Sequence, residues 1–311
     1  MCIRDRDIDC LIDDFNGDGK LDLIVASGGS EYSNFSPELR DRLYLNIGDK
    51  NFKKLPNSLS SISSFESTST ISSYDFDRDG DKDLFLGTRL NPGAYGTKTR
   101  SYLLENNGDG IFKDISEKYL GDTRFMGMVT DSEFIDIDND NTKELIVVGE
   151  WMPVKIFKFL QNKLVDITDS LGLSKTNGLY NNMHSEDLDG DGYTDLVLGN
   201  YGLNSMFRAS IEQPLSLYVN DFDNNGRTEQ ILAMHYDEKL YPIVQLKDLW
   251  MQIPSLKKKY LKFENYKNVT MDKLFDPSTI RDSEVKKVYN LSSVSLYNKR
   301  GKGFDLSLIH I

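Results

Sequence analysis

One nine-residue acidic pattern recurs five times along the chain and constrains the fold more than any other feature. The pattern is D-x-[DN]-x-[DN]-[GN]-x-x-[DE], and its copies begin at residues 14, 75, 136, 187 and 221. Successive starts are therefore 61, 61, 51 and 34 residues apart. Recurrence at intervals of this size is the sequence signature of repeat architectures, in which every repeat supplies one supersecondary unit.

Each acidic copy leads directly into a short apolar run rich in β-branched residues. Four of the runs end in glycine or alanine, at 23–26, 84–87, 145–149 and 196–199, and the fifth is 231–233. Such runs predict buried strands. A second repeated element, Leu-Tyr-Leu-Asn at 43–46, returns at 103–106 and begins again at 296–298.

The repeated unit of about 60 residues contains several short strands joined by turns and no regular helix. Four-stranded sheets repeated around an axis suit this pattern, because neighbouring sheets protect most strand edges. We therefore predict an all-β fold, a β-propeller whose blades are about 60 residues long. The chain is expected to hold four to five blades of a larger ring.

One stretch, residues 247–275, departs from the strand pattern. Apolar residues recur there at helical spacing among many lysines: Leu246, Leu249, Trp250, Ile253, Leu256, Tyr260 and Phe263. With Pro254 and Pro277 as punctuation, this predicts an amphipathic helical insertion, preceded by a hairpin that turns at Asp237 and Glu238. Its apolar stripe is expected either to pack on the propeller flank or to bind a partner.

The expected organisation follows from these elements. Blades are expected over residues 7–235, the hairpin and helical insertion over 236–290, and the start of a further blade over 291–305. The end segments 1–6 and 306–311 are expected to be adapter-derived, because their codons can be written as the two strands of one short DNA.

Alternating carboxylates followed by glycine provide what a hard divalent cation needs from a tight loop. Positions one, three and five direct oxygens to one centre, glycine at six permits the turn, position seven can offer its carbonyl, and the acid at nine can bind through both oxygens. The candidate ligands are Asp14, Asn16, Asp18, Lys20, Asp22; Asp75, Asp77, Asp79, Asp81, Asp83; Asp136, Asp138, Asp140, Thr142, Glu144; Asp187, Asp189, Asp191, Tyr193, Asp195; Asp221, Asp223, Asn225, Arg227 and Glu229.

Calcium is the expected ion, with up to five bound, because magnesium demands near-octahedral geometry and keeps its waters. An EF-hand is excluded, since its glutamate stands at position twelve. Here the twelfth positions are Val25, Leu86, Val147, Leu198 and Leu232. A single copy is also an ordinary turn sequence. The second and fourth copies are complete, whereas the third has Asn141 for glycine and the fifth has Asn225, so these two are expected to be weakest.

The acidic charge supports a structural ion. Positions one, three, five and nine of the five copies hold 18 of the 49 acidic residues, and the formal net charge is −12. Carboxylates packed this closely repel one another unless a cation lies among them. An acidic chain without a basic stripe predicts no nucleic-acid partner, and no apolar run is long enough to predict membrane insertion.

The acidic copies with their following Asp-Leu-x-x-Gly strands resemble the FG-GAP or VCBS repeats of integrin-α-like propellers. Phrases at 41–46, 92–96, 149–153 and 199–204 are similar to large bacterial surface or secreted proteins with VCBS repeats, often associated with an ASPIC/UnbV domain. The resemblance implies a seven-bladed propeller with calcium in the loops. It also implies an extracellular, cell-surface or outer-membrane-associated location.

We expect a binding or scaffold module rather than an enzyme. His184 and His235 are 51 residues apart, and neither stands near a nucleophile motif. A protein or polysaccharide ligand is expected on the loops after the second strands, where the candidates are Arg89, Tyr95, Trp151, Tyr201 and Asn204. Tyr201 and Trp151 are equally consistent with packing between blades. The alternative is a propeller lyase or hydrolase acting on polysaccharide.

Overall fold

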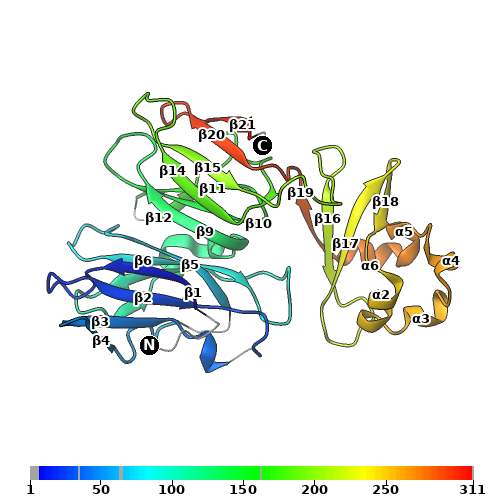
Figure 1. Cartoon of the computed structure of the whole chain (residues 1–311), viewed down its shortest axis with the longest axis horizontal. Coiled ribbons are helices and arrows are strands. Elements are labelled where there is room, and N and C mark those ends of the chain that lie inside the picture. Colours follow the sequence, from blue (N-terminus) through cyan, green and yellow to red (C-terminus); the bar gives the residue numbers. More distant parts are fainter. Residues whose placement is uncertain (1–6, 34–35, 63–65, 162, 310–311) are drawn as a thin grey trace.

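The computed structural model describes residues 7–33, 36–62, 66–161 and 163–309 (Figure 1). The end segment 1–6 and residues 310–311, expected to be adapter-derived, lie outside the described residues. The described chain forms five antiparallel sheets with a few short helices, which confirms an all-β, propeller-like fold. None of the five sheets is closed on itself in this part of the chain.

Two four-stranded sheets come first along the chain. The first contains β1 (Asp7–Asp13), β2 (Asp22–Ser27), β3 (Arg42–Gly48) and β4 (Asn51–Lys54) in chain order. The second contains β5 (Ser67–Tyr74), β6 (Asp83–Leu90), β7 (Tyr102–Asn106) and β8 (Phe112–Asp114). A 3-10 turn, η1 (Pro37–Leu39), precedes β3, and α1 (Ser116–Leu120) with η2 (Gly121–Arg124) follows β8.

The third and fourth sheets repeat this order, and the third has one additional strand. The third contains β9 (Met128–Ile135), β10 (Glu144–Met152), β11 (Lys155–Leu160) and β12 (Lys163–Asp166), and β13 (Gly178–Leu179) also pairs with β10. The fourth contains β14 (Asn182–Glu186), β15 (Asp195–Gly199), β20 (Val294–Asn298) and β21 (Phe304–Leu308). The apolar runs of the sequence are the second strands β2, β6, β10 and β15.

The first strands of these four sheets lie side by side, as in a propeller: β1 beside β5, β5 beside β9, and β9 beside β14. Carboxylates join them. Asp9 accepts the backbone N–H of Ile71 at 2.9 Å, and Asp131 accepts that of Met183 at 2.7 Å. Each contact ties the edge of one sheet to the next, which protects edge groups that would otherwise be unpaired.

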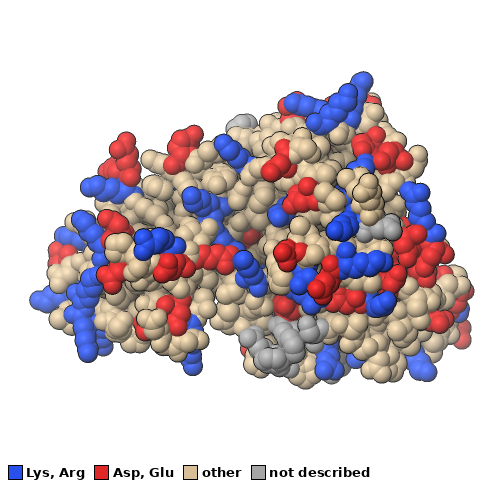
Figure 2. All heavy atoms as spheres, turned by 180° about the vertical axis from the view of Figure 1, so that it is seen from behind, with Lys and Arg blue, Asp and Glu red and all other residues tan. Residues whose placement is uncertain are grey.

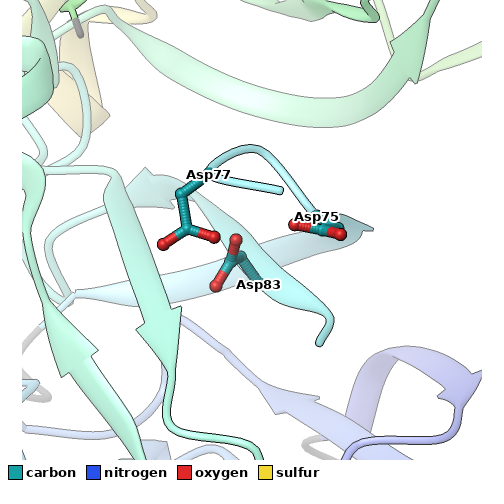
Figure 3. Close-up of side chains that lie close together, drawn as sticks. All are labelled: Asp75, Asp77 and Asp83. Atoms are coloured by element: carbon teal, nitrogen blue, oxygen red, sulfur yellow. The ribbon is translucent and has the colours of Figure 1, made fainter. Parts of the chain in front are cut away.

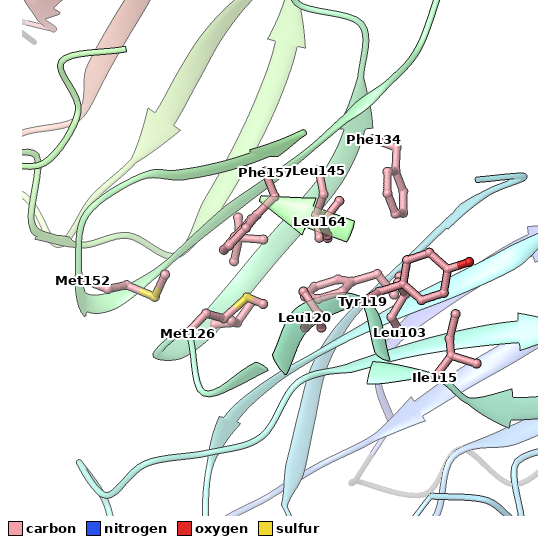
Figure 4. Close-up of a cluster of buried hydrophobic side chains, with 13 residues drawn as sticks. Leu103, Ile115, Tyr119, Leu120, Met126, Phe134, Leu145, Met152, Phe157 and Leu164 are labelled. Atoms are coloured by element: carbon pink, nitrogen blue, oxygen red, sulfur yellow. The ribbon is translucent and has the colours of Figure 1, made fainter. Parts of the chain in front are cut away.

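Apolar side chains fill the space between adjacent sheets. Between the second and third sheets, Leu103 and Ile115 face Leu145 and Phe157, with Tyr119 of α1 packed between them (Figure 4). Equivalent clusters join the first sheet to the second and the third to the fourth. The core therefore lies between the sheets, as expected for radially packed blades.

A large insertion interrupts the fourth sheet between β15 and β20, over residues 200–293. It contains a fifth sheet and five short helices. Figure 1 shows the insertion to one side of the other four sheets. The sheet has the order β18-β17-β16-β19, with β16 (Leu215–Asn220), β17 (Glu229–Tyr236), β18 (Lys239–Pro242) and β19 (Glu284–Val288). The helices are α2 (Leu246–Gln252), α3 (Leu256–Lys259), α4 (Phe263–Tyr266), α5 (Met271–Leu274) and α6 (Pro277–Asp282).

The hairpin turn at Asp237 and Glu238 is present between β17 and β18, and both residues have positive φ. The expected helical insertion is present and is divided into short helices. Its apolar positions pack on the fifth sheet, where Leu249 and Ile253 join Phe222 and Ile231 in one buried cluster. The stripe therefore covers its own sheet rather than the flank of the four-sheet body.

Two expected boundaries differ from the strand pairing. The blades are expected to continue to residue 235, but strands β16 and β17 both belong to the inserted sheet. The stretch 291–305 was expected to begin a further blade, yet β20 pairs with β15 and completes the fourth sheet. Asn200 closes the insertion, since its side-chain amide donates to the carbonyls of Asn290 and Ser292. Strand β21 extends to Leu308, within the end segment expected to be adapter-derived.

Candidate functional site

The five acidic copies form five loops at equivalent places, each between two antiparallel strands. The first to fourth acidic loops join the first and second strands of the four main sheets, and the fifth joins β16 to β17 of the inserted sheet. The repeated sequence thus produces a repeated strand-to-strand turn. All twenty-five predicted ligand positions lie in or directly beside these turns.

The acid at position nine is buried in every loop and anchors the loop backbone. One of its oxygens accepts the backbone N–H of position two at 2.9–3.2 Å. The five anchors are Asp22, Asp83, Glu144, Asp195 and Glu229. A buried carboxylate that accepts backbone N–H groups fixes the turn, because leaving those groups unpaired costs free energy.

The acid at position one closes the turn from its other side. Its carboxylate accepts the backbone N–H of position six at 2.8–3.1 Å in all five loops. Position six has positive φ throughout, which favours glycine. In the third loop Asn141 adopts φ 65°, a conformation that asparagine tolerates better than most residues. The third loop, expected to be weak for lack of glycine, therefore forms the same turn.

Carboxylate oxygens converge in four of the loops. In each of these loops, one oxygen from each of positions one, three and nine lies within 4.8 Å of the others. The groups are Asp75, Asp77, Asp83; Asp136, Asp138, Glu144; Asp187, Asp189, Asp195; and Asp221, Asp223, Glu229. Figure 3 shows the first of these, with the carboxylates of Asp77 and Asp83 turned toward each other. In the first loop Asn16 supplies an amide oxygen at position three instead.

The second loop shows what such convergence costs without a cation. Burial, with smaller contributions from the nearby carboxylates of Asp77 and Asp81, raises the pKa of Asp83 to about 7. Burial, followed by the neighbouring Asp79, raises the pKa of Asp81 to about 6. Buried oxygens of Asp75 and Asp81 have no hydrogen-bond partner within the described chain, and the same is true of Asp223 in the fifth loop and of Asp138 and Glu144 in the third. An all-oxygen donor set with unpartnered buried oxygens fits a hard cation such as calcium.

The third loop differs, because a lysine from another strand enters it. The Nζ atom of Lys158, in β11, lies 2.5 Å from Asp138, 2.8 Å from Asp140 and 2.8 Å from Glu144. Its hydrogen bond to Asp140 lowers the pKa of that carboxyl. Sequence reasoning missed Lys158, since it lies 14 residues beyond the acidic copy and only the strand register brings it back.

Asparagines of the third strands tie the loops to the sheets. The buried carboxylate of Asp83 accepts the backbone N–H of Asn106 at 2.9 Å, and that of Asp195 accepts Asn298 at 2.7 Å. Their amide side chains then donate to the position-two carbonyl of the preceding sheet's loop, Phe15 for Asn106 and Ile137 for Asn298. The repeated asparagine of the sequence thus has a defined role between sheets.

Three of the five ligand-face candidates gather around Glu150. Arg89 donates to both oxygens of Glu150, at 3.1 and 2.7 Å, and the hydroxyl of Tyr95 donates to one of them at 2.9 Å. The indole N–H of Trp151 donates to the Tyr95 hydroxyl at 2.8 Å. Trp151 is buried, has φ 63°, and packs against Leu217 of the inserted sheet. This cluster joins the insertion to the main body.

The other two candidates lie elsewhere, in the segment that leaves β15. Tyr201 is exposed and its ring packs against Phe207 at a centroid distance of 5.5 Å, and Asn204 is exposed nearby. Over the face shown in Figure 2, acidic and basic side chains are interspersed.

The fold and its loops define a class: a repeat-built β protein whose sheets carry acidic turns between their first and second strands. The family model described as FG-GAP-like repeat matches residues 14–86, from the start of the first acidic loop to within β6. This part of the chain is thus similar to FG-GAP-like repeats. No curated protein matches the chain. No helix in the described part of the chain is long and apolar enough to cross a membrane.

Proposed function

We propose that this chain is a calcium-stabilised binding or scaffold module of a large bacterial protein exposed outside the cell. The observation that carries the proposal is the convergence of three acidic oxygens in each of four loops at equivalent places. Five such turns, in register with the following strands, are more than ordinary turn chemistry requires. An FG-GAP-like repeat over residues 14–86 supports the same conclusion.

Calcium fits the loops better than other ions. The donors are carboxylates and two amides, which excludes soft metals that prefer thiolate or imidazole. Calcium accepts six to eight oxygens in flexible geometry, whereas magnesium requires a near-ideal octahedron. The proposed ligands are the side chains at positions one, three, five and nine, together with the backbone carbonyl at position seven.

The acidic loops account for most clustered carboxylates, which favours binding over catalysis. Each position-nine acid is already committed to backbone N–H groups. The proposed ligand is a protein or a polysaccharide, and an ASPIC/UnbV-type neighbour belongs to the same proposal. Turnover of an acidic polysaccharide panel would instead support a lyase or hydrolase, whereas binding without turnover supports the module proposed here.

Thermal unfolding in chelator and in calcium tests the proposal. A ligand that binds only the folded state at 100 times its dissociation constant adds about 2.7 kcal/mol per site. Extracellular calcium modules bind at about 10⁻⁴–10⁻³ M, so the rise in Tm should develop over millimolar calcium. Magnesium at the same concentration is the control and should give a smaller rise. An identical Tm in chelator and in calcium would overturn the proposal.

A further inference from the structure

Lys158 places an ammonium group among three carboxylates of the third acidic loop. Its ammonium group contacts Asp138, Asp140 and Glu144, which stand at positions three, five and nine. These are three of the positions from which a calcium ion would be held. An ammonium group has three hydrogens to donate and no acceptor, and here it lies within ion-pair distance of three carboxylates.

The strand register explains why this occurs in one sheet alone among the four main sheets. In β11 the residue paired with Leu145 is Phe157, and Lys158 follows it. In the first, second and fourth sheets, the residues equivalent to Leu145 are Leu23, Leu84 and Leu196. The position that matches Lys158 is the residue directly after the third-strand partner of each leucine. The residues found there are Leu45, Glu105 and Tyr297, none of which is cationic.

The contact also differs from other cations near the loops. The side chain of Lys158 is 17% exposed, and Glu144 is fully buried. Lys20 and Arg300 each touch one loop carboxylate, Asp18 and Asp191, and their side chains are 47% and 70% exposed. Exposed pairs of that kind contribute little and are readily displaced. A lysine that is mostly buried among three carboxylates is a fixed part of the loop.

We propose that Lys158 is the built-in cation of the third loop, so that this loop takes no calcium while the other loops do. The inference rests on the proposed calcium function and deepens it by assigning the sites. The third sheet, which lies between the second and fourth, is then held by an internal ion pair whatever the calcium concentration. Calcium affects the sheets on either side of it.

Substitution of Lys158 should convert the third loop into a calcium site. Lys158→Met keeps the length of the stem and removes the charge, leaving four carboxylates without a counter-ion. Native mass spectrometry in millimolar calcium should count one more calcium ion in this variant than in the unchanged chain. Lys155→Met is the matched control, because Lys155 is on the same strand and pairs with Asp166 outside the loop; its count should not change.

Paired aspartate substitutions keep the test independent of how well the Lys158 variant folds. Asp138→Asn with Asp140→Asn should leave the calcium count of the Lys158-containing chain unchanged. Asp77→Asn with Asp79→Asn, at the same positions of the second loop, should lower it by one. An equal count with and without Lys158, or loss of an ion on changing the third loop, overturns the inference. If the unchanged chain binds no calcium, the proposed function itself fails.

Discussion

At the scale of single residues, the most consequential groups are the buried acids at position nine. Asp195 shows why: one oxygen accepts the N–H of Leu188 within its loop, and the other accepts the N–H of Asn298, which is 103 residues away. The residue therefore joins the turn to a strand that returns after the insertion. Its role does not depend on a bound ion.

Replacing Asp195 should destabilise the chain even in chelator. Asp195→Ala leaves two buried N–H groups without acceptors, at a cost of about 1–3 kcal/mol each. Asp189→Ala, in the same loop but exposed, removes one of several repelling carboxylates and should change the free energy of unfolding by less than about 0.5 kcal/mol. Chemical denaturation of both variants in chelator measures the difference, and equal effects would contradict this role for Asp195.

Another acid, the partly buried Asp41, should make stability depend on pH. It accepts the N–H of Ser27 at 2.7 Å and the hydroxyl of Thr68 at 2.9 Å, which links the first sheet to the second. Burial raises its pKa to about 7 in the folded chain, against about 3.9 when unfolded. The folded state therefore binds the extra proton between these values, so stability contributed by Asp41 falls as pH rises from about 4 to about 7.

Asp41→Asn cannot be ionised and should remove this contribution. Denaturation midpoints measured from pH 5 to pH 8 in chelator should fall less steeply with rising pH in the variant than in the unchanged chain. Asp7, Asp9 and the loop acids remain in both proteins, so the comparison isolates Asp41. Parallel pH profiles would show that Asp41 keeps its ordinary behaviour in the folded state.

Residue identities in the loops could be predicted from sequence because the turn is local. The nine positions contain all the groups that close the turn. The apolar residue at position twelve indicates that a strand begins directly after the acid at position nine. Lys158 and the donors Asn106 and Asn298 could not be assigned in the same way. Their contacts depend on which strand pairs with which, information that no single repeat contains.

At the scale of elements, the helical insertion shows what the spacing of apolar residues predicts and what it does not. The apolar positions Leu249 and Ile253 are buried as their spacing predicts, yet the segment is divided into short helices. Pro254 disfavours helix at the residue before it, and α2 ends at Gln252. Pro277 instead begins α6, at a position where proline is tolerated.

The helices should stabilise the inserted sheet through their buried face. Leu249→Ala removes a fully buried side chain that packs in the cluster with Phe222 and should cost about 2–5 kcal/mol. Met251→Ala is the control, since Met251 lies on the same helix and is 75% exposed; its effect should be within about 0.5 kcal/mol. Urea denaturation followed by tryptophan fluorescence measures both, and equal midpoints would contradict the observed packing.

At the scale of the whole molecule, the chain consists of four sheets in propeller order and a fifth sheet inserted into the fourth (Figure 1). Sequence order suggested consecutive blades, because the fifth acidic copy continues the repeat. The spacing of the asparagine element contained the contrary signal: Asn46 and Asn106 lie 24 and 23 residues beyond their acids, whereas Asn298 lies 103 beyond Asp195. The difference is the insertion.

Apolar contacts also join the insertion to the main body. Leu217 and Val288 of the inserted sheet pack against Trp151 and Leu90 of the main body. Two of the residues expected to face a ligand, Tyr95 and Trp151, are used in this junction. The acidic loops between strands remain the feature that all five sheets share. We propose that these loops, except the third, bind calcium.

A crystal structure of the chain grown in calcium, with anomalous diffraction data, tests that claim most directly. We predict calcium density in the second loop, bound by Asp75, Asp77 and Asp83, and equivalent density in the first, fourth and fifth loops. In the third loop we expect the ammonium group of Lys158 and no anomalous peak. Acidic loops without anomalous density in saturating calcium, or ions bound only elsewhere, would contradict the proposal that these loops bind calcium.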